Sequence, residues 1–145
     1  MELYQESIPS SKLTQRTMNQ IYTIAVDFDG TCVEHDYPEV GLDVEGAVET
    51  LRDLQSRGHR IILFTMRSGP KLDAAVKWFK ERKITLWGIN ENPEQSKWTE
   101  SPKVYADFYI DDSALGCPIT FIDGVRHHVV NWAKVRTLLE YNRIL

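Results

Sequence analysis

Residues 21–31 read IYTIAVDFDGT, an apolar and β-branched run that ends in two aspartates, a glycine and a threonine. The run at 21–26 has the composition of a buried strand in a parallel sheet. Asp27 then falls at the last position of that strand, and Asp29 in the turn after it. Gly30, in this turn, can adopt backbone conformations that are unfavourable for a residue with a side chain. The stretch therefore predicts a strand that delivers two carboxylates to one edge of a sheet.

Downstream of this stretch, predicted strands alternate with predicted helices. Further strands are predicted at 60–64, 84–89, 107–110 and 119–122. Helices are predicted from Asp43 to Gly58, from Ser68 and Pro70 onward, and from Asn131 onward, each with an apolar side. Such alternation favours right-handed crossovers in a parallel sheet. We therefore expect an α/β fold, a three-layer Rossmann-like sandwich whose five parallel strands have the order 5-4-1-2-3.

The composition is that of one ordinary globular domain. The chain has 145 residues, of which 42% are hydrophobic and 26% are charged. One domain of this size can bury a stable core without disulfide bonds or structural metals. Residues 1–20 are polar and weakly patterned. We expect them to form an N-terminal arm that is disordered or contacts another subunit, and residues 21–145 to form the domain.

Charge, hydropathy and cysteine count exclude several classes of protein. The formal net charge of −4 gives no general attraction to nucleic acid or to an anionic membrane. No apolar run approaches the roughly 20 residues that span a bilayer, and the N-terminus lacks the pattern of a signal peptide. Cys32 and Cys117 have no paired spacing and are expected to be reduced thiols. We therefore expect a cytoplasmic protein.

Acidic and hydroxyl-bearing residues follow three of the predicted strands. They are Asp27 and Asp29, then Thr65, then the pair Asp111 and Asp112. Ligands of parallel α/β sheets bind beyond the carboxyl ends of the strands, so the fold would bring these residues to one edge. Carboxylates this close need a cation to stay charged in a dry pocket. An all-oxygen set suits Mg²⁺, and no histidine or cysteine has zinc-like spacing.

These groups together predict phosphoryl transfer through an aspartyl-phosphate. Asp27 would attack phosphorus as the nucleophile. Asp29 would protonate the leaving oxygen and then activate the water that cleaves the intermediate. Thr65 and a lysine would hold the phosphoryl oxygens. The partner would be a phosphorylated substrate, either a small phosphomonoester or the exposed phosphate of a larger molecule.

The sequence resembles the haloacid dehalogenase superfamily in its phosphatase branch. Residues 27–31 are similar to that superfamily's first motif (DxDGT), Thr65 to its second, and Asp111-Asp112 to the paired acids of its fourth. The resemblance covers residues 21 to about 125 and implies a hydrolase domain of this type at 21–145.

The resemblance also implies a set of metal ligands. Asp27, the backbone carbonyl of Asp29, and Asp111 would bind Mg²⁺, and Asp112 would bind it directly or through water. Dehalogenases of the superfamily lack the second aspartate of the first motif. Asp29 therefore favours a phosphatase over a dehalogenase.

The lysine of the superfamily's third motif is open between Lys103 and Lys97. Lys103 lies in SPKVYADFYIDD, which looks like the corresponding segment of deoxynucleotidase-type members. Eight residues of continuous strand would span roughly 26 Å. Lys103 can therefore serve only if the strand begins near Asp107 and the chain before it bends back. We favour Lys103 on the resemblance, with Lys97 in the polar loop as the alternative.

Members of the superfamily usually carry a cap domain over the site. Neither residues 32–42 nor residues 68–102 are enough to house one, so no separate cap domain is expected. The site would then be open unless loops or a neighbouring subunit cover it. A homo-oligomer and a large substrate are the two hypotheses that follow.

Two functions of another class compete with the phosphatase. A receiver-like signalling module also has an acidic pocket, Mg²⁺, a threonine and a lysine, but it has no use for Asp29. A pseudoenzyme that only binds phosphate is the other alternative.

Several further residues are given simpler interpretations. Arg67 is left open between binding substrate and pairing with a surface acid. Histidines 35, 127 and 128 are expected to be solvated or hydrogen-bonded, and Cys32 to be a packed thiol. Trp98, in a polar loop, is the aromatic residue most suited to face a substrate.

Overall fold

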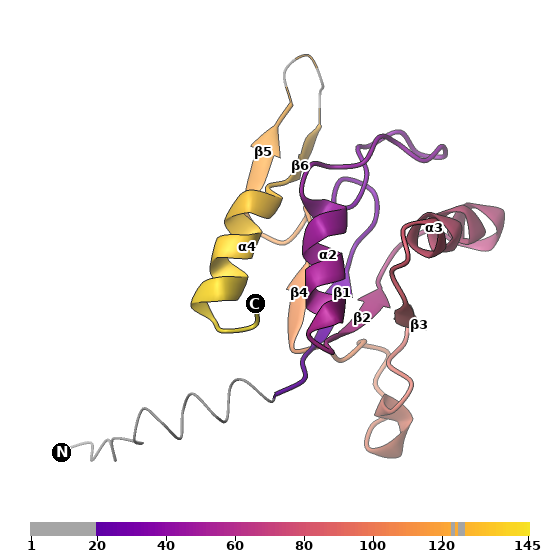
Figure 1. The fold of residues 1–145 in the computed structure, drawn as a ribbon. Helices are drawn as coiled ribbons and strands as arrows, with labels where there is room; N and C mark the ends of the chain where they lie inside the picture. The colour runs from indigo at the N-terminus through magenta and orange to yellow at the C-terminus, as the bar shows by residue number, and fades with distance from the viewer. Residues whose placement is uncertain (1–19, 123, 125–126) are drawn as a thin grey trace.

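The computed structural model describes residues 20–122, 124 and 127–145, and Figure 1 shows how their helices and strands are arranged. The predicted N-terminal arm, residues 1–20, lies outside the described residues except for Gln20. Within the described residues, no helix is both long enough and apolar enough to cross a membrane.

A parallel sheet of four strands forms the centre of the fold. The strands lie in the order β3-β2-β1-β4, which is the order predicted for these four. Their bounds are β1 (Thr23–Val26), β2 (Arg60–Leu63), β3 (Leu86–Ile89) and β4 (Phe108–Ile110). All four residues of β1 are buried, because this strand has a neighbour on each side and is covered on both faces. Its unbroken apolar sequence follows from that position.

In the part of the chain that the structure describes, three α-helices accompany the sheet. They are α2 (Ala47–Ser56), α3 (Gly69–Glu81) and α4 (Trp132–Tyr141). Three of the predicted end signals are confirmed. Pro70 lies in the first turn of α3, the Asn131 side chain accepts a hydrogen bond from the Lys134 N–H at the start of α4, and Gly58 after α2 has a φ of 87°.

The helix after β1 starts later than predicted. The sequence predicts Asp43 as its cap, but the Asp43 carboxylate accepts hydrogen bonds from Trp78 Nε1 and from the Arg82 guanidinium. The chain turns at Gly46, where φ is 83°, and α2 begins at Ala47. The aspartate therefore ties the preceding loop to α3 instead of capping α2.

The three helices of the described residues pack on the same face of the sheet, so within that part of the chain the predicted third layer is not found. The main core joins Leu51 of α2, Phe79 of α3 and Val135 of α4 to Ile24 and Val26 of β1. Figure 1 shows α2 and α4 on the same side of β1 and β4. The opposite face of the sheet, here called the outer face, has only a small separate core. Its members are Ala25, Ile62, Val104 and Ala106, with Trp87 against them.

The connection between β3 and β4 explains the missing helical layer. Residues 90–107 cross the outer face and contain two prolines and a single short 3₁₀ helix, η1 (Gln95–Lys97). The buried Gln95 side chain bonds the backbones of Ser101, Lys103 and Tyr105. One irregular segment, held by one glutamine, stands where a helix would complete the third layer.

The predicted fifth parallel strand belongs to a different sheet. Residues 119–122 contribute β5 (Ile119–Phe121), which pairs antiparallel with β6 (His128–Val130), a strand the sequence did not predict. Only eight residues separate β4 from β5, and a parallel crossover needs about a dozen or more. In the part of the chain that the structure describes, β4 is therefore an edge strand of the main sheet.

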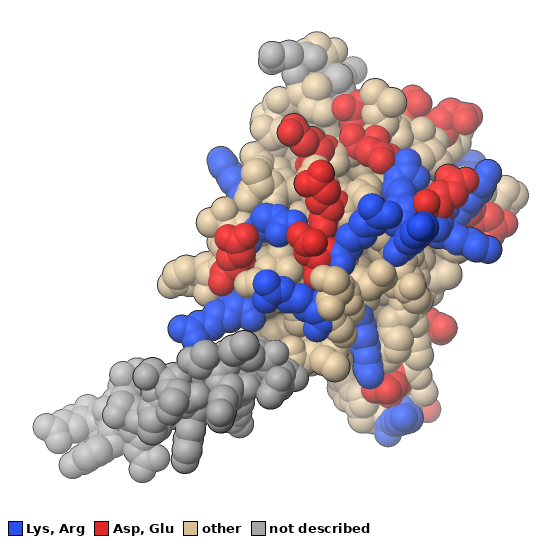
Figure 2. Space-filling model, in the orientation of Figure 1, with Lys and Arg blue, Asp and Glu red and all other residues tan. Residues whose placement is uncertain are grey.

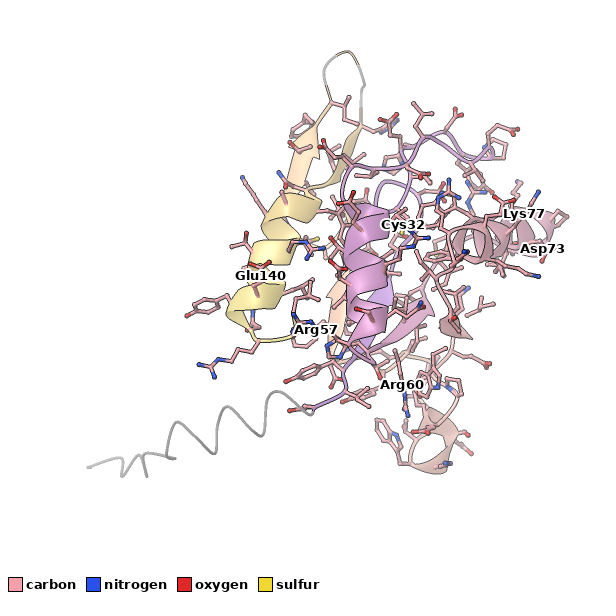
Figure 3. All side chains as sticks on the ribbon, viewed as in Figure 1. Cys32, Arg57, Arg60, Asp73, Lys77 and Glu140 are labelled. Atoms are coloured by element: carbon pink, nitrogen blue, oxygen red, sulfur yellow. The ribbon has the colours of Figure 1, made fainter. Side chains whose placement is uncertain are left out.

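Charged side chains of both signs cover the helical face. Figure 2 shows acidic and basic groups intermixed over the face it presents, in keeping with the small net charge of −4. Asp73 and Lys77 of α3 and Glu140 of α4 are exposed and point away from the sheet (Figure 3). The helices are thus amphipathic, with their apolar sides on the core.

Candidate functional site

An acidic cluster lies where β1 and β4 end. The N–H of Asp27 donates to the carbonyl oxygen of Ile110 at 3.0 Å, so the pairing of the two strands continues into the residues that follow them. Asp27, Asp111 and Asp112 each present a carboxylate oxygen, and these oxygens lie within 4.8 Å of one another. The structure therefore brings together three of the acids that the sequence placed at strand ends.

The hydroxyl of Thr31 links two members of this cluster. Thr31 is fully buried. Its Oγ1 donates to Asp27 Oδ2 at 2.9 Å and accepts from the Asp112 N–H at 3.2 Å. Cys32 is buried next to it, and its Sγ donates to the Asp27 carbonyl at 3.3 Å. The threonine of the DFDGT stretch thus fixes the orientation of the Asp27 carboxylate, and Cys32 is the packed thiol that was expected.

The cluster has an excess of negative charge. Burial, and then the nearby charges of Asp111 and Asp112, raise the pKa of Asp27 from 3.8 to about 8, although the Thr31 hydroxyl lowers it in part. Burial also raises the pKa of Asp111. Among the described residues, no lysine or arginine forms an ion pair with these three acids.

Two histidines flank the cluster on the Asp112 side. His35 Nε2 lies 3.0 Å from Asp112 Oδ2, and His128 Nε2 lies 3.5 Å from the same oxygen and 3.1 Å from the Asp112 carbonyl. Gly30 sits beneath this arrangement with a φ of 80°, and a Cβ there would overlap His35 Nε2 and press on Asp112 Oδ2. The glycine of the DFDGT stretch is therefore required both for its conformation and for space.

Asp29 stands apart from the acidic cluster and is paired with Arg67. Arg67 Nε donates to Asp29 Oδ2 at 2.8 Å, and Nη2 donates to Asp29 Oδ1 at 2.7 Å. The Arg67 side chain is only 1% exposed and that of Asp29 is 19% exposed. This bidentate geometry is the strong form of an arginine–carboxylate pair, and the hydrogen bond to Asp29 raises the pKa of Arg67.

The other donors of Arg67 hold the loop that follows β1. Nη1 donates to the carbonyls of Pro38 and Lys71, and Nη2 donates to the carbonyl of Glu39. The guanidinium carbon also lies 5.3 Å from the centroid of the Tyr37 ring. Arg67 therefore connects Asp29, the loop at residues 37–39 and the start of α3 in one buried contact.

Thr65 and Lys103 lie on opposite sides of β1. Thr65 follows β2; its N–H donates to Asn90 Oδ1 and its hydroxyl accepts from the Arg67 N–H. Lys103 lies on the outer face with Nζ 6.0 Å from the centroid of the Tyr109 ring. The first of the two conditions set for Lys103, a strand that begins near Asp107, is met, because β4 begins only at Phe108.

Lys97, the alternative, lies in η1. Neither it nor Lys103 is within ion-pairing distance of a carboxylate in the residues that the structure describes.

The donors in the acidic cluster fit a divalent cation. Three carboxylate oxygens within 4.8 Å of one another form a hard, all-oxygen set of the kind that Mg²⁺ accepts. Burial, and then the nearby charges of Asp111 and Asp112, raise the pKa of Asp27, and a bound cation would favour its charged form. The Asp29 side chain is not among these donors.

Sequence reasoning missed two features of the site. The pairing of Arg67 with Asp29 could not be chosen over a surface pair, since the two residues are 38 positions apart. The contacts of His35 and His128 with Asp112 were equally hidden. The only signal available was that the histidines occur close to the two acidic stretches along the chain.

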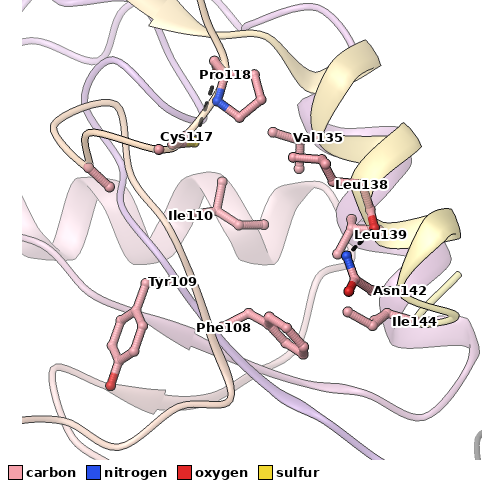
Figure 4. A pocket seen from close by; sticks show the side chains of 12 residues that line it. Phe108, Tyr109, Ile110, Cys117, Pro118, Val135, Leu138, Leu139, Asn142 and Ile144 are labelled. Atoms are coloured by element: carbon pink, nitrogen blue, oxygen red, sulfur yellow. Dashed lines mark hydrogen bonds between the residues drawn. The ribbon is translucent and has the colours of Figure 1, made fainter.

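An apolar cavity lies elsewhere. It has a volume of about 330 Å³ and lies between the free edge of β4 and α4, lined by Cys117, Pro118, Val135, Leu138 and Ile144 among others (Figure 4). None of the predicted site residues lines it. The acidic cluster therefore lies outside this cavity.

Comparison with known proteins places the chain in a family without assigning an activity. No protein-family model and no curated protein matches it. Among solved structures, a conserved protein from Bacteroides thetaiotaomicron is similar, with 35% sequence identity and a TM-score of 0.71. The match covers 85% of this chain and 93% of that one. This chain belongs to the same family as that conserved Bacteroides protein.

Proposed function

We propose that this protein is a magnesium-dependent phosphomonoester hydrolase of the haloacid dehalogenase type that works through an aspartyl-phosphate on Asp27. The observation that carries the proposal is the approach of Asp27, Asp111 and Asp112 to within 4.8 Å at the carboxyl edge of a parallel sheet. Ligands of such sheets bind at that edge. Three partly or fully buried carboxylates that pair with no lysine or arginine among the described residues suit a bound cation.

The metal would be held by the chain's own oxygen donors. These are the carboxylates of Asp27, Asp111 and Asp112, with the carbonyl of Asp29. Bound Mg²⁺ would supply positive charge that offsets the repulsion between the carboxylates and an anionic phosphate.

The reaction would proceed in two displacements at phosphorus. The Asp27 carboxylate, oriented by the Thr31 hydroxyl, forms a bond to phosphorus as the bond to the leaving oxygen breaks. Asp29 gives its proton to the leaving oxygen, then takes a proton from the water that hydrolyses the acyl phosphate. Thr65 and Lys103 would hold the phosphoryl oxygens.

The Asp29–Arg67 pair supports a second candidate, a phosphate-binding or phospho-accepting protein that does not turn over. Both Asp29 oxygens accept hydrogen bonds from Arg67. At least one of these hydrogen bonds must break before the Asp29 carboxyl can reach a leaving oxygen. A protein that kept Asp29 in this position would hold its phosphate instead of hydrolysing it.

The free thiols fit a reducing compartment, and we place the protein in the cytoplasm. Cys32 and Cys117 are unbonded to one another. Burial raises the pKa of the Cys32 thiol well above its ordinary value and also raises that of Cys117. Both therefore stay protonated and unreactive at neutral pH.

Turnover of p-nitrophenyl phosphate with and without Mg²⁺ separates the two candidates. A phosphatase gives steady turnover that requires the metal and falls at least about 1,000-fold in Asp27→Asn. The matched control is Asp53→Asn, since Asp53 pairs with Arg136 on the surface. Stoichiometric phosphorylation of Asp27 without turnover would favour the phospho-accepting protein, and neither labelling nor turnover would contradict both.

A further inference from the structure

Two aromatic rings lie exposed on the outer face of the sheet. Phe64 follows β2 and Tyr109 lies in β4, and each is 38% exposed. The two rings tilt toward each other with their centroids 6.3 Å apart, although β1 separates their strands. The rings therefore lean across β1, where the small side chain of Ala25 leaves room for them.

The pairing of the strands places Phe64 beside the candidate nucleophile and Tyr109 beside Ala25, two positions earlier. The Phe64 N–H donates to the Val26 carbonyl at 2.8 Å, so the pairing of β2 with β1 continues past Leu63 and sets Phe64 next to Asp27. Residues two apart in a strand share a face, so Asp27 follows Ala25 on the outer face. Ala25 in turn pairs with Tyr109.

The Tyr109 ring is fixed before any ligand arrives. Its hydroxyl donates to the Val104 carbonyl at 2.6 Å and accepts from the Ala106 N–H at 3.2 Å. Lys103 lies over the same ring. In the described residues no helix lies on the outer face, and the two rings remain partly exposed beside the 90–107 connection, so a group bound at Asp27 can reach them.

We propose that Phe64 and Tyr109 form the floor on which the leaving group of the substrate lies, and that they favour phosphomonoesters whose leaving group carries a flat aromatic ring. The inference rests on the proposed function, because it takes Asp27 as the point of attack. Aromatic rings gain from offset or edge-to-face contact beyond the area they bury. A saturated ring of the same size buries similar area but lacks this gain.

The test compares benzyl phosphate with cyclohexylmethyl phosphate. Both leaving groups are primary alcohols with a six-membered ring on the same carbon, so they differ chiefly in the flatness of the ring. The kcat/KM for benzyl phosphate is expected to be about 3- to 10-fold higher. In Phe64→Leu, which keeps an apolar side chain without a ring, this ratio falls toward one.

Tyr141→Leu is the matched control. Tyr141 is an exposed aromatic residue at the end of α4, and its replacement leaves the ratio unchanged. Two further pairs, adenosine monophosphate with ribose phosphate and O-phosphotyrosine with O-phosphoserine, show whether a nucleobase or a phenol supplies the ring. The pair whose kcat/KM ratio drops in Phe64→Leu identifies which kind of ring the two aromatic residues contact.

The possible outcomes distinguish this inference from the function it rests on. Equal kcat/KM for benzyl and cyclohexylmethyl phosphate in the wild-type protein overturns the inference and leaves the phosphatase standing. A preference for benzyl phosphate that survives both Phe64→Leu and Tyr109→Leu overturns it as well. Absence of turnover with every ester, p-nitrophenyl phosphate included, removes the proposed function and the inference together.

Discussion

Asp27 and Asp29 lie two residues apart in one turn, and the fold gives their carboxylates opposite surroundings. Asp27 is close to two other acids and is stabilised by one hydroxyl. Asp29 receives two hydrogen bonds from a guanidinium that is itself almost fully buried. One carboxylate lacks a cation and the other has its cation built into the chain.

The spacing of a DxD motif does not distinguish its two acids. The difference between Asp27 and Asp29 comes from the side chains that surround each carboxylate. Groups whose environments differ this strongly are suited to different steps of one reaction. The Asp27 cluster is a place where an external cation would bind. The position of Asp29 is instead controlled by Arg67 and, through Arg67, by the loop at residues 37–39.

After Asp27→Asn, replacing Asp29 with asparagine should have the largest effect on activity. The amide of Asp29→Asn keeps the shape of the side chain, and its oxygen can accept one of the two hydrogen bonds from Arg67, but it cannot carry a proton to or from substrate. The kcat for benzyl phosphate is expected to fall about 10²- to 10⁴-fold, measured beside Asp53→Asn as the control. Wild-type kcat in Asp29→Asn would contradict the acid/base role.

Removing Arg67 should have the largest effect on stability. Arg67→Met leaves the partly buried Asp29 carboxylate without its cation and three backbone carbonyls without their donor. The free energy of unfolding is expected to fall by about 3–5 kcal/mol, measured by urea denaturation.

The control for Arg67→Met is Arg136→Met, which breaks the exposed pair with Asp53. That change should cost about 0–1 kcal/mol. If the two losses were equal, Arg67 would be no more than another surface arginine, and the contrast between Asp27 and Asp29 would lose its structural basis.

The strand ends of the site could be predicted from the sequence because they follow from local pattern. An apolar run ending in acid fixes where Asp27 lies, and parallel strands carry their carboxyl ends to one edge, which brings Asp111 and Asp112 to it. The pairing of Asp29 could not be predicted in this way. It depends on a contact across 38 positions and on a loop that closes over Arg67.

The prediction of a third layer follows from the general architecture of such sheets and not from the residues themselves. The connection at residues 90–107 is polar, contains Pro93 and Pro102, and gives no periodic apolar stripe. Local pattern therefore argues against a helix there, and the fold follows the local pattern. The fifth strand differs for another reason. Only eight residues separate β4 from β5, too few for the crossover that a parallel strand requires.

The smallest predicted effect tests the charge of the Asp27 cluster directly. The pKa of Asp27 is raised from 3.8 to about 8, so between about pH 4 and pH 8 the folded protein holds a proton that the unfolded chain has lost. The stability of the metal-free protein should therefore fall as the pH rises through this window.

Mg²⁺ competes with that proton for the same oxygens. The rise in Tm on adding MgCl₂ should be near zero at the acid end of the window and a few degrees at its alkaline end, measured by thermal unfolding. In Asp27→Asn the dependence of this rise on pH should flatten, while in Asp53→Asn it should persist. A rise in Tm that is the same at every pH would mean that Mg²⁺ binds somewhere other than this cluster, because only a site that must first lose a proton couples metal binding to pH.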